Sequence, residues 1–220
     1  MTYSVAKFQG ADIVEEEVRA LKKLERNYDD GISLVEKFSL CDGWCYYPQL
    51  FTVKSHHVDL IGLTDPSVCE ECIKFDVECR TCDLVSFPEI IANFKFLKKL
   101  YLNFHLYHAL KTVPDSFKEL RLLEALFIVD AKLIRLPDFI GDYKNLKYLN
   151  LNGNKLTELP ESIGNLTSLQ ELILRSNQLS SLPDSFAKLK SLQYLDLSLN
   201  NFESLPEIIE ERRYEMEIIL

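Results

Sequence analysis

The stretch LPESIGNLTSLQELILRSNQLSS, Leu159–Ser181, decides the fold of this chain. In LQELILRSN, the two-residue spacing of Leu172 and Leu174 predicts a short strand with one buried face. Ile163, Leu166 and Leu169 are spaced three apart, which predicts a helical or 3₁₀ stripe facing the same core. Proline stands where a helix starts or an extended segment turns. The stretch therefore predicts a strand and a short helical turn that share one core.

The same unit recurs along the C-terminal two thirds of the chain. An apolar residue followed by proline lies at Phe87, Val113, Leu136, Leu159, Leu182 and Leu205, with spacings of 26, 23, 23, 23 and 23 residues. This pattern over residues 84–220 resembles the leucine-rich-repeat family in its 23-residue LPxxIxxLxxLxxLxLxxNxL form. No unit can bury its own apolar edges, so the units have to stack into a solenoid.

The resemblance implies an α/β horseshoe with a parallel concave β-sheet and short helices or 3₁₀ turns on the convex side. It also implies that Asn154, Asn177 and Asn200 lie inside the turns and bond backbone groups of adjacent coils. Two early repeats depart from the pattern: Ala131 takes the asparagine position, and a three-residue insertion lies near FHLYHALK.

The ends of a solenoid need caps, and the sequence predicts two domain segments. Residues 1–83 form an N-terminal helical and cysteine-rich cap that includes the first strand, and residues 84–220 form one continuous repeat solenoid. Within the cap, ADIVEEEVRALKKLERN is amphipathic and predicts a helix, whereas YYPQLFTVK and HVDLIGL predict strands. At the C-terminal end, EIIEERRYEMEIIL predicts a polar helix and a last strand, with Ile218 and Leu220 pointing inward.

Two C-x-x-C pairs, Cys69, Cys72, Cys79 and Cys82, lie in an insertion of the cap coil after the HVDLIGL strand. Their two-knuckle spacing predicts a structural zinc site with all four ligands from protein and no open position for catalysis. Free thiols and disulfides are the alternatives. Cys41 and Cys45 are interpreted as buried cap residues, and His56 and His57 as ordinary cap or surface residues, although each could also be a ligand.

Composition narrows the classes of partner. The net charge is −9 and the pI is about 5.0, which disfavours nucleic acid as a partner held by bulk electrostatics. The N-terminus lacks an apolar secretion signal, and no apolar run approaches the ~20 residues that span a bilayer. We therefore expect a cytoplasmic protein that does not bind membranes, in a compartment where paired cysteines more often hold metal than form disulfides.

In each LxxLxL unit, the residues between and after the leucines point away from the core onto the concave sheet. These positions form three columns along the stack and contain a stripe of aromatic residues, which is typical of interface hot spots. The alternatives are that N-terminal residues fold over this face, or that these residues only stabilise the sheet by cross-strand packing. The predicted partner-binding residues are Tyr101, Phe127, Val129, Tyr148, Asn150, Ile173, Arg175, Tyr194 and Asp196.

The sequence therefore predicts a non-catalytic module that binds a partner protein on the concave face, with a metal-stapled cap. One alternative is a redox- or metal-responsive cysteine switch that regulates this binding. An enzyme of ligase type is the weaker alternative, because the sequence has no Gly-rich phosphate loop, no H-E-x-x-H motif and no convergent carboxylates.

Overall fold

The computed structural model describes residues 5–8, 11–14, 50–54, 57–64, 91–103, 110–204, 206–210, 212 and 214–220. The boundary predicted at residues 83 and 84 lies outside these ranges, as do residues 104–109 of the FHLYHALK segment near which the three-residue insertion is predicted. None of the described helices is long and apolar enough to cross a membrane.

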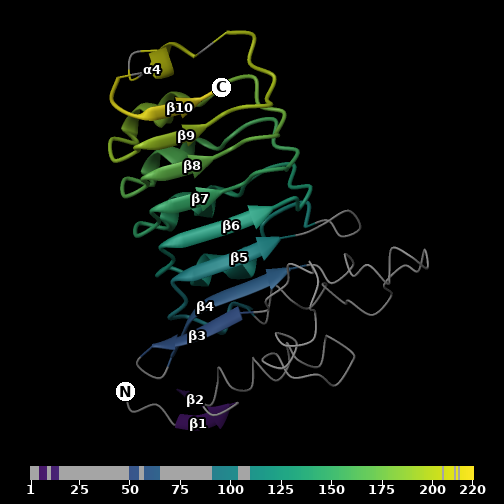
Figure 1. Cartoon of the computed structure of the whole chain (residues 1–220), viewed down its shortest axis with the longest axis vertical. Helices are drawn as coiled ribbons and strands as arrows, with labels where there is room; N and C mark the ends of the chain where they lie inside the picture. The colour runs from purple at the N-terminus through teal and green to yellow at the C-terminus, as the bar shows by residue number, and fades with distance from the viewer. Residues whose placement is uncertain are drawn as a thin grey trace, which may run out of the picture.

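One sheet runs through the described repeats, with its strands stacked in chain order (Figure 1). Its eight described strands are β3 (Leu50–Lys54), β4 (His57–Thr64), β5 (Lys99–Asn103), β6 (Ala125–Val129), β7 (Tyr148–Asn150), β8 (Glu171–Ile173), β9 (Tyr194–Asp196) and β10 (Glu217–Ile219). β3 pairs antiparallel with β4, and all later neighbours pair in parallel. The predicted strands and the predicted parallel sheet are confirmed.

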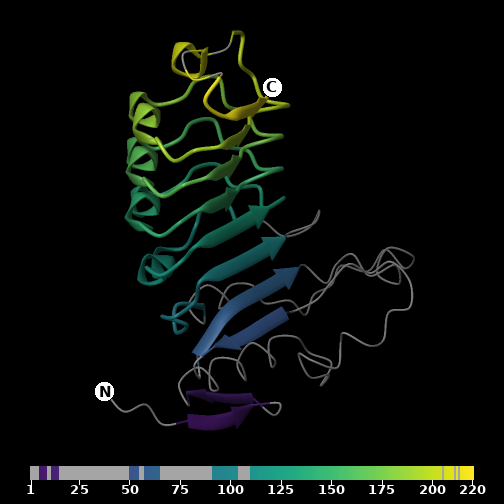
Figure 2. The same cartoon turned by 60° about the vertical axis from the view of Figure 1, so that its left-hand side comes forward.

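From Asp115 onward, the other side of each described coil carries a short helical turn (Figure 2). Four coils have 3₁₀ helices, η3 (Asp115–Glu119), η4 (Asp138–Asp142), η5 (Glu161–Asn165) and η6 (Asp184–Lys188), and α4 (Glu207–Glu210) follows in the last described coil. A proline with extended backbone precedes each 3₁₀ helix; Pro160, for example, has φ −68° and ψ 150°. The proline therefore turns the extended segment into the helix, as the sequence predicted.

The core is a stack of leucine rows between the strands and the 3₁₀ helices. In the coil that decided the fold, Ile163, Leu166, Leu169, Leu172 and Leu174 are all fully buried. Tyr143 takes the place of one such leucine, and its hydroxyl donates a hydrogen bond to the carbonyl oxygen of Phe117 at 2.8 Å. Burial and the neighbouring Asp142 raise the pKa of this hydroxyl.

The turn asparagines tie neighbouring coils together. The side-chain nitrogen of Asn154 donates to the carbonyl oxygens of Ile128 at 2.7 Å and Leu151 at 2.8 Å. Its side-chain oxygen accepts the backbone N–H groups of Ala131 at 3.1 Å and Leu133 at 3.0 Å. Asn177 and Asn200 repeat this pattern one and two coils later, so the predicted role of these asparagines is confirmed.

Two predictions at the ends of the chain are wrong at the residues that the structure describes. The predicted N-terminal helix begins with strand β2 (Ala11–Val14), which pairs antiparallel with β1 (Val5–Phe8), and its remaining residues lie outside the described ranges. Only Gln9 and Gly10 separate these strands, and a two-residue connection with glycine favours a hairpin over a helix. At the other end, Leu220 is 67% exposed rather than inward, because the last described coil has a neighbouring coil on one side only.

Candidate functional site

The outer side of the sheet, which we call the concave face, carries three columns of side chains in strict register. Strand pairing aligns the first column as Lys99, Ala125, Tyr148, Glu171, Tyr194 and Glu217. The central column is Tyr101, Phe127, Asn150, Ile173, Asp196 and Ile219. The third column is formed by Val129 at the end of β6 and by Asn152, Arg175 and Ser198, which follow β7, β8 and β9. The repeat register therefore brings the nine predicted partner-binding residues onto one face.

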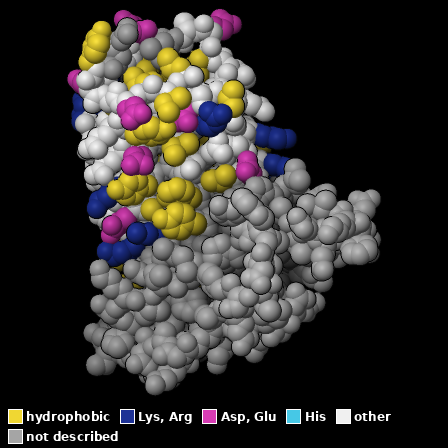
Figure 3. All heavy atoms as spheres, viewed as in Figure 1, with side chains coloured by type: hydrophobic (Ala, Val, Ile, Leu, Met, Phe, Trp, Pro, Cys, Tyr) yellow, Lys and Arg dark blue, Asp and Glu magenta, His cyan; other side chains and the backbone are white. Residues whose placement is uncertain are grey.

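The N-terminal half of the concave face is aromatic. The rings of Tyr101 and Phe127 lie with centroids 4.5 Å apart at an interplanar angle of 34°. Tyr148 lies in the next strand, and all three side chains are half-buried, as is Val129. Figure 3 shows hydrophobic side chains gathered on this face. Apolar surface of this kind on a sheet is typical of an interaction site.

The C-terminal half of the face is polar and held by side-chain hydrogen bonds. Ser198 donates its backbone N–H and its hydroxyl to Oδ1 of Asp196, at 2.9 and 2.6 Å. Nη1 of Arg175 donates to the Ser198 hydroxyl at 2.8 Å. Asp196 is only 7% exposed, although the sequence placed it in a solvent-facing column. Arg175, Ser198 and Asp196 therefore form one chain of hydrogen bonds across two coils.

Tyr194 lies between two glutamates of the first column. Register pairs it with Glu171 on one side and Glu217 on the other. Desolvation raises the pKa of its hydroxyl, the charges of Asp196, Glu217 and Glu171 raise it further, and Arg175 opposes them. Three carboxylates and one guanidinium therefore act on this hydroxyl.

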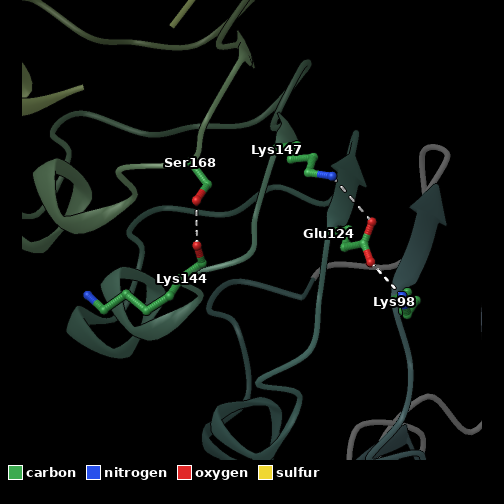
Figure 4. A network of polar contacts seen from close by, with 5 residues as sticks. All are labelled: Lys98, Glu124, Lys144, Lys147 and Ser168. Carbon is green, nitrogen blue, oxygen red and sulfur yellow. Dashed lines mark hydrogen bonds and ion pairs between the residues drawn. The ribbon is translucent and has the colours of Figure 1, made fainter. Parts of the chain in front are cut away.

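An ion-pair network borders the first column (Figure 4). Oε1 of Glu124 accepts a hydrogen bond from Nζ of Lys98 at 2.7 Å, and Oε2 lies 3.7 Å from Nζ of Lys147. The hydrogen bond from Lys98 and the charges of both lysines lower the pKa of Glu124 against the opposing effect of desolvation. In the adjoining part of the same view, the Ser168 hydroxyl donates to the carbonyl oxygen of Lys144 at 2.7 Å.

Glu124→Gln is expected to lower the free energy of unfolding at pH 7 by about 0.5 kcal/mol, because both lysines are substantially exposed and the pair is screened. A lowered pKa stabilises the fold above the unfolded value of about 4.5, and this contribution is lost as pH falls through the folded value. Urea titrations of both proteins at pH 7 and pH 2.5 check this. The difference should vanish at the lower pH, and the exposed Glu158→Gln control should show no comparable difference. If the free energies of unfolding still differed at pH 2.5, the ion pairs of Glu124 would not be the cause of the difference.

Sequence reasoning did not select Ser198, Glu171 or Glu217 as site residues. The repeat pattern indicates their places in the columns, but the composition of interface hot spots favours aromatic and apolar residues. The link between Ser198 and Arg175 joins the ends of two adjacent strands, and the repeat register is the signal that could have found it.

The predicted zinc ligands Cys69, Cys72, Cys79 and Cys82 lie outside the described residues, as do Cys41, Cys45 and His56. His57 is the first residue of β4. In the ranges that the structure describes, no group of three or more metal-binding side chains occurs. The zinc site therefore stays a prediction.

Comparisons with known proteins agree with the repeat pattern. Residues 138–213 match the family model described as a leucine-rich repeat region. A leucine-rich-repeat protein of Leptospira interrogans is 32% identical over 68% of this chain and 44% of its own, with a TM-score of 0.48. An internalin of Listeria monocytogenes is 23% identical over 60% of this chain and 36% of its own, with a TM-score of 0.49.

The leucine-rich repeat domain of the type III effector XopL is 28% identical over 54% of this chain and 43% of its own, with a TM-score of 0.48. The chain thus spans less than half the length of each of these three solved structures. No curated protein sequence matches it significantly. The family-model match shows that residues 138–213 are a leucine-rich repeat region, and the coils on their N-terminal side continue its strand register.

Proposed function

We propose that this protein is a non-catalytic interaction module that binds a partner protein on its concave face. The observation that carries the proposal is an aromatic stripe of three half-buried residues on three neighbouring strands. Tyr101 and Phe127 lie in the central column, and Tyr148 lies in the first column of the next strand. Aromatic residues supply large, rigid contact areas and dominate many protein interfaces. A stack of coils supplies the extended surface on which such residues can be presented together.

The polar groups beside the stripe support the same proposal. Asn150 offers a donor and an acceptor in the column that holds Tyr101 and Phe127, and Asn152 and Arg175 offer polar groups in the third column beside it. Asn150 already accepts the backbone N–H of Asn152 through its side-chain oxygen at 2.9 Å, which fixes the orientation of its amide. An apolar centre with polar groups at its border is the usual composition of a specific protein interface.

The combined substitution Phe127→Ala and Tyr148→Ala is expected to weaken partner binding at least about tenfold, because hot-spot aromatic residues contribute about 2 kcal/mol or more each. The measurement is affinity capture from an extract of the source cells, followed by titration of the captured protein. The matched control is Leu122→Ala with Ile134→Ala, two exposed hydrophobic residues that lie outside the three columns. Equal loss in both variants, or undiminished binding in the first, would contradict the proposal.

Cys69, Cys72, Cys79 and Cys82 are proposed to bind one structural zinc ion that staples the cap, in a protein of the reducing cytoplasm. The support is their sequence spacing, since a C-x-x-C turn directs two thiolates to one side and two such turns supply four ligands. A bound metal ion would stabilise the end coil in place of the hydrophobic core that this coil lacks. A redox switch built on the same thiols remains the alternative use of these residues.

Elemental analysis of protein purified under reducing conditions should find about one zinc ion per chain. Replacing Cys69 and Cys82 with serine should abolish the bound metal, whereas Cys41→Ser should not. Metal-free protein with four reactive thiols in this segment would overturn the zinc proposal and favour the thiol alternative.

A further inference from the structure

The concave face is chemically polarised along the stack. Its N-terminal half holds the aromatic rings of β5 to β7, and its C-terminal half holds Glu171, Asp196 and Glu217 on β8 to β10. Arg175 is the single cation that the described residues place in the C-terminal half of these columns, and it is engaged with Ser198. The C-terminal half of the columns therefore contains three carboxylates and one guanidinium.

Building on the proposed function, we propose that the concave face binds an extended segment of a partner protein that carries an apolar side chain and a lysine or arginine four residues apart. The apolar side chain packs on Phe127 and Tyr148, and the cation lies over Asp196 between Glu171 and Glu217. Charge complementarity selects this occupant, because a basic group gains from the carboxylates and an acidic group is repelled by them.

Asp196 is the centre of the proposed cation subsite. The residue is 7% exposed, and both hydrogen bonds to its carboxylate, from Ser198, reach Oδ1. In the described part of the chain, Oδ2 accepts no hydrogen bond, so this oxygen is available to a donor of the partner. A largely buried carboxylate is costly unless it is paired, and a partner's cation would complete the pairing.

The two glutamates widen this subsite. They stand on the strands to either side of β9, each directly beside Tyr194 in the first column, and both side chains are exposed. The raised pKa of the tyrosine hydroxyl agrees with a negative potential at this point. An ammonium or guanidinium group above Tyr194 would also meet the face of its ring, which attracts cations.

The spacing in the partner follows from the sheet geometry. Phe127 and Asp196 lie in the same column on β6 and β9, three strand steps apart. At about 4.8 Å per step this separation is about 14 Å, and an extended chain of about 3.3 Å per residue covers it in four residues. Side chains at positions i and i+4 of an extended segment point to the same side, so both can face the sheet. A helix, at about 1.5 Å per residue, would need about nine residues instead.

The test is selection of a phage-displayed library of random 12-residue peptides on the full chain. We expect enriched peptides with an aromatic or aliphatic residue four positions from a lysine or arginine. Synthetic versions should bind at least about tenfold more weakly to the triple variant Glu171→Gln, Asp196→Asn, Glu217→Gln. They should bind unchanged to Glu119→Gln, Glu158→Gln, Glu203→Gln, which removes the same charge from exposed residues outside the columns.

Each other result is decisive and separates this inference from the proposed function. Peptides without a basic residue that lose binding on Phe127→Ala overturn the inference and leave the concave-face function standing. Peptides that are indifferent to both sets of substitutions overturn both. Enrichment of acidic peptides, or of no peptide above a blank surface, overturns the inference, while the capture experiment with Phe127 and Tyr148 still decides the function.

Discussion

Replacing Asn177 with alanine is expected to lower the free energy of unfolding by about 3 kcal/mol. Its side-chain nitrogen donates to the carbonyl oxygens of Leu151 and Leu174, both at 2.9 Å, and its oxygen accepts the N–H of Leu156 at 3.1 Å. The residue is only 6% exposed, so alanine would leave these backbone groups buried without a partner. Each buried unpaired group costs about 1–3 kcal/mol.

The effect should spread beyond one coil. Leu151 and Leu156 belong to the preceding coil, so the asparagine stabilises the interface between two coils as well as its own turn. In a solenoid, the interface terms make the coils unfold together. We therefore expect the midpoint of the whole unfolding transition to move to a lower urea concentration. Equilibrium urea unfolding followed by circular dichroism measures this shift.

Asn165→Ala is the matched control, because Asn165 is the exposed last residue of η5 in the same repeat. Its effect should stay within about 0.5 kcal/mol. A loss at Asn177 no larger than at Asn165 would show that the hydrogen-bonded asparagines do not stabilise the stack.

Gly164→Ala is expected to destabilise the protein by about 2–3 kcal/mol through overpacking. A Cβ atom at this glycine would lie 2.3 Å from the carbonyl oxygen of Ser185 and 2.6 Å from its Cβ. Backbone atoms of the next coil cannot move aside without separating η5 from η6. Gly141 meets Ser162 in the same way one coil earlier, at 2.3 Å from its carbonyl oxygen.

The sign of this prediction distinguishes it from the usual effect of such a change. Glycine to alanine often stabilises a protein by about 0.4–1 kcal/mol, since alanine restricts the unfolded chain. A stabilising Gly164→Ala would therefore show that the two 3₁₀ helices do not approach as closely as described. Thermal unfolding with a matched denaturant titration gives the sign directly.

Ser185→Ala supplies the control from the other side of the same contact. The Ser185 hydroxyl is buried and, among the described residues, has no hydrogen-bond partner. Removing it eliminates an unsatisfied polar group, so stability should stay the same or rise. A lower stability of Gly164→Ala together with an unchanged or higher stability of Ser185→Ala would show that the close approach of the two coils causes the loss.

Much of the candidate site could be predicted because strand register follows repeat register. The columns through Tyr101, Phe127 and Asn150 are the ones that the 23-residue spacing predicted, although the first interval is longer. Exposure could not be predicted equally well. Asp196 is buried because Ser198 and neighbouring coils cover it, and Ala125 is buried because its short side chain lies between Lys99 and Tyr148 in register.

The N-terminal region shows where periodicity alone is insufficient. The apolar residues Ile13 and Val14 fit a helical stripe, yet both lie in strand β2 opposite Ala6 and Val5. A short apolar run fits either period, and the pairing strand decides between them. That strand begins six residues before the segment from which the helix was predicted, outside the window of the pattern.

The sequence by itself determined the length of the coil, the direction and register of the strands, and the position of the turn asparagines. These features repeat along the chain, so each coil has the same sequence pattern and adopts the same local structure. The coils stack because this buries their apolar edges. Only the tertiary structure decided which side chains meet across coils: Glu124 between two lysines, Gly164 against Ser185, and Arg175 bonded to Ser198. The reason is that such contacts depend on distances between residues more than twenty positions apart, and no pattern within one coil contains those distances.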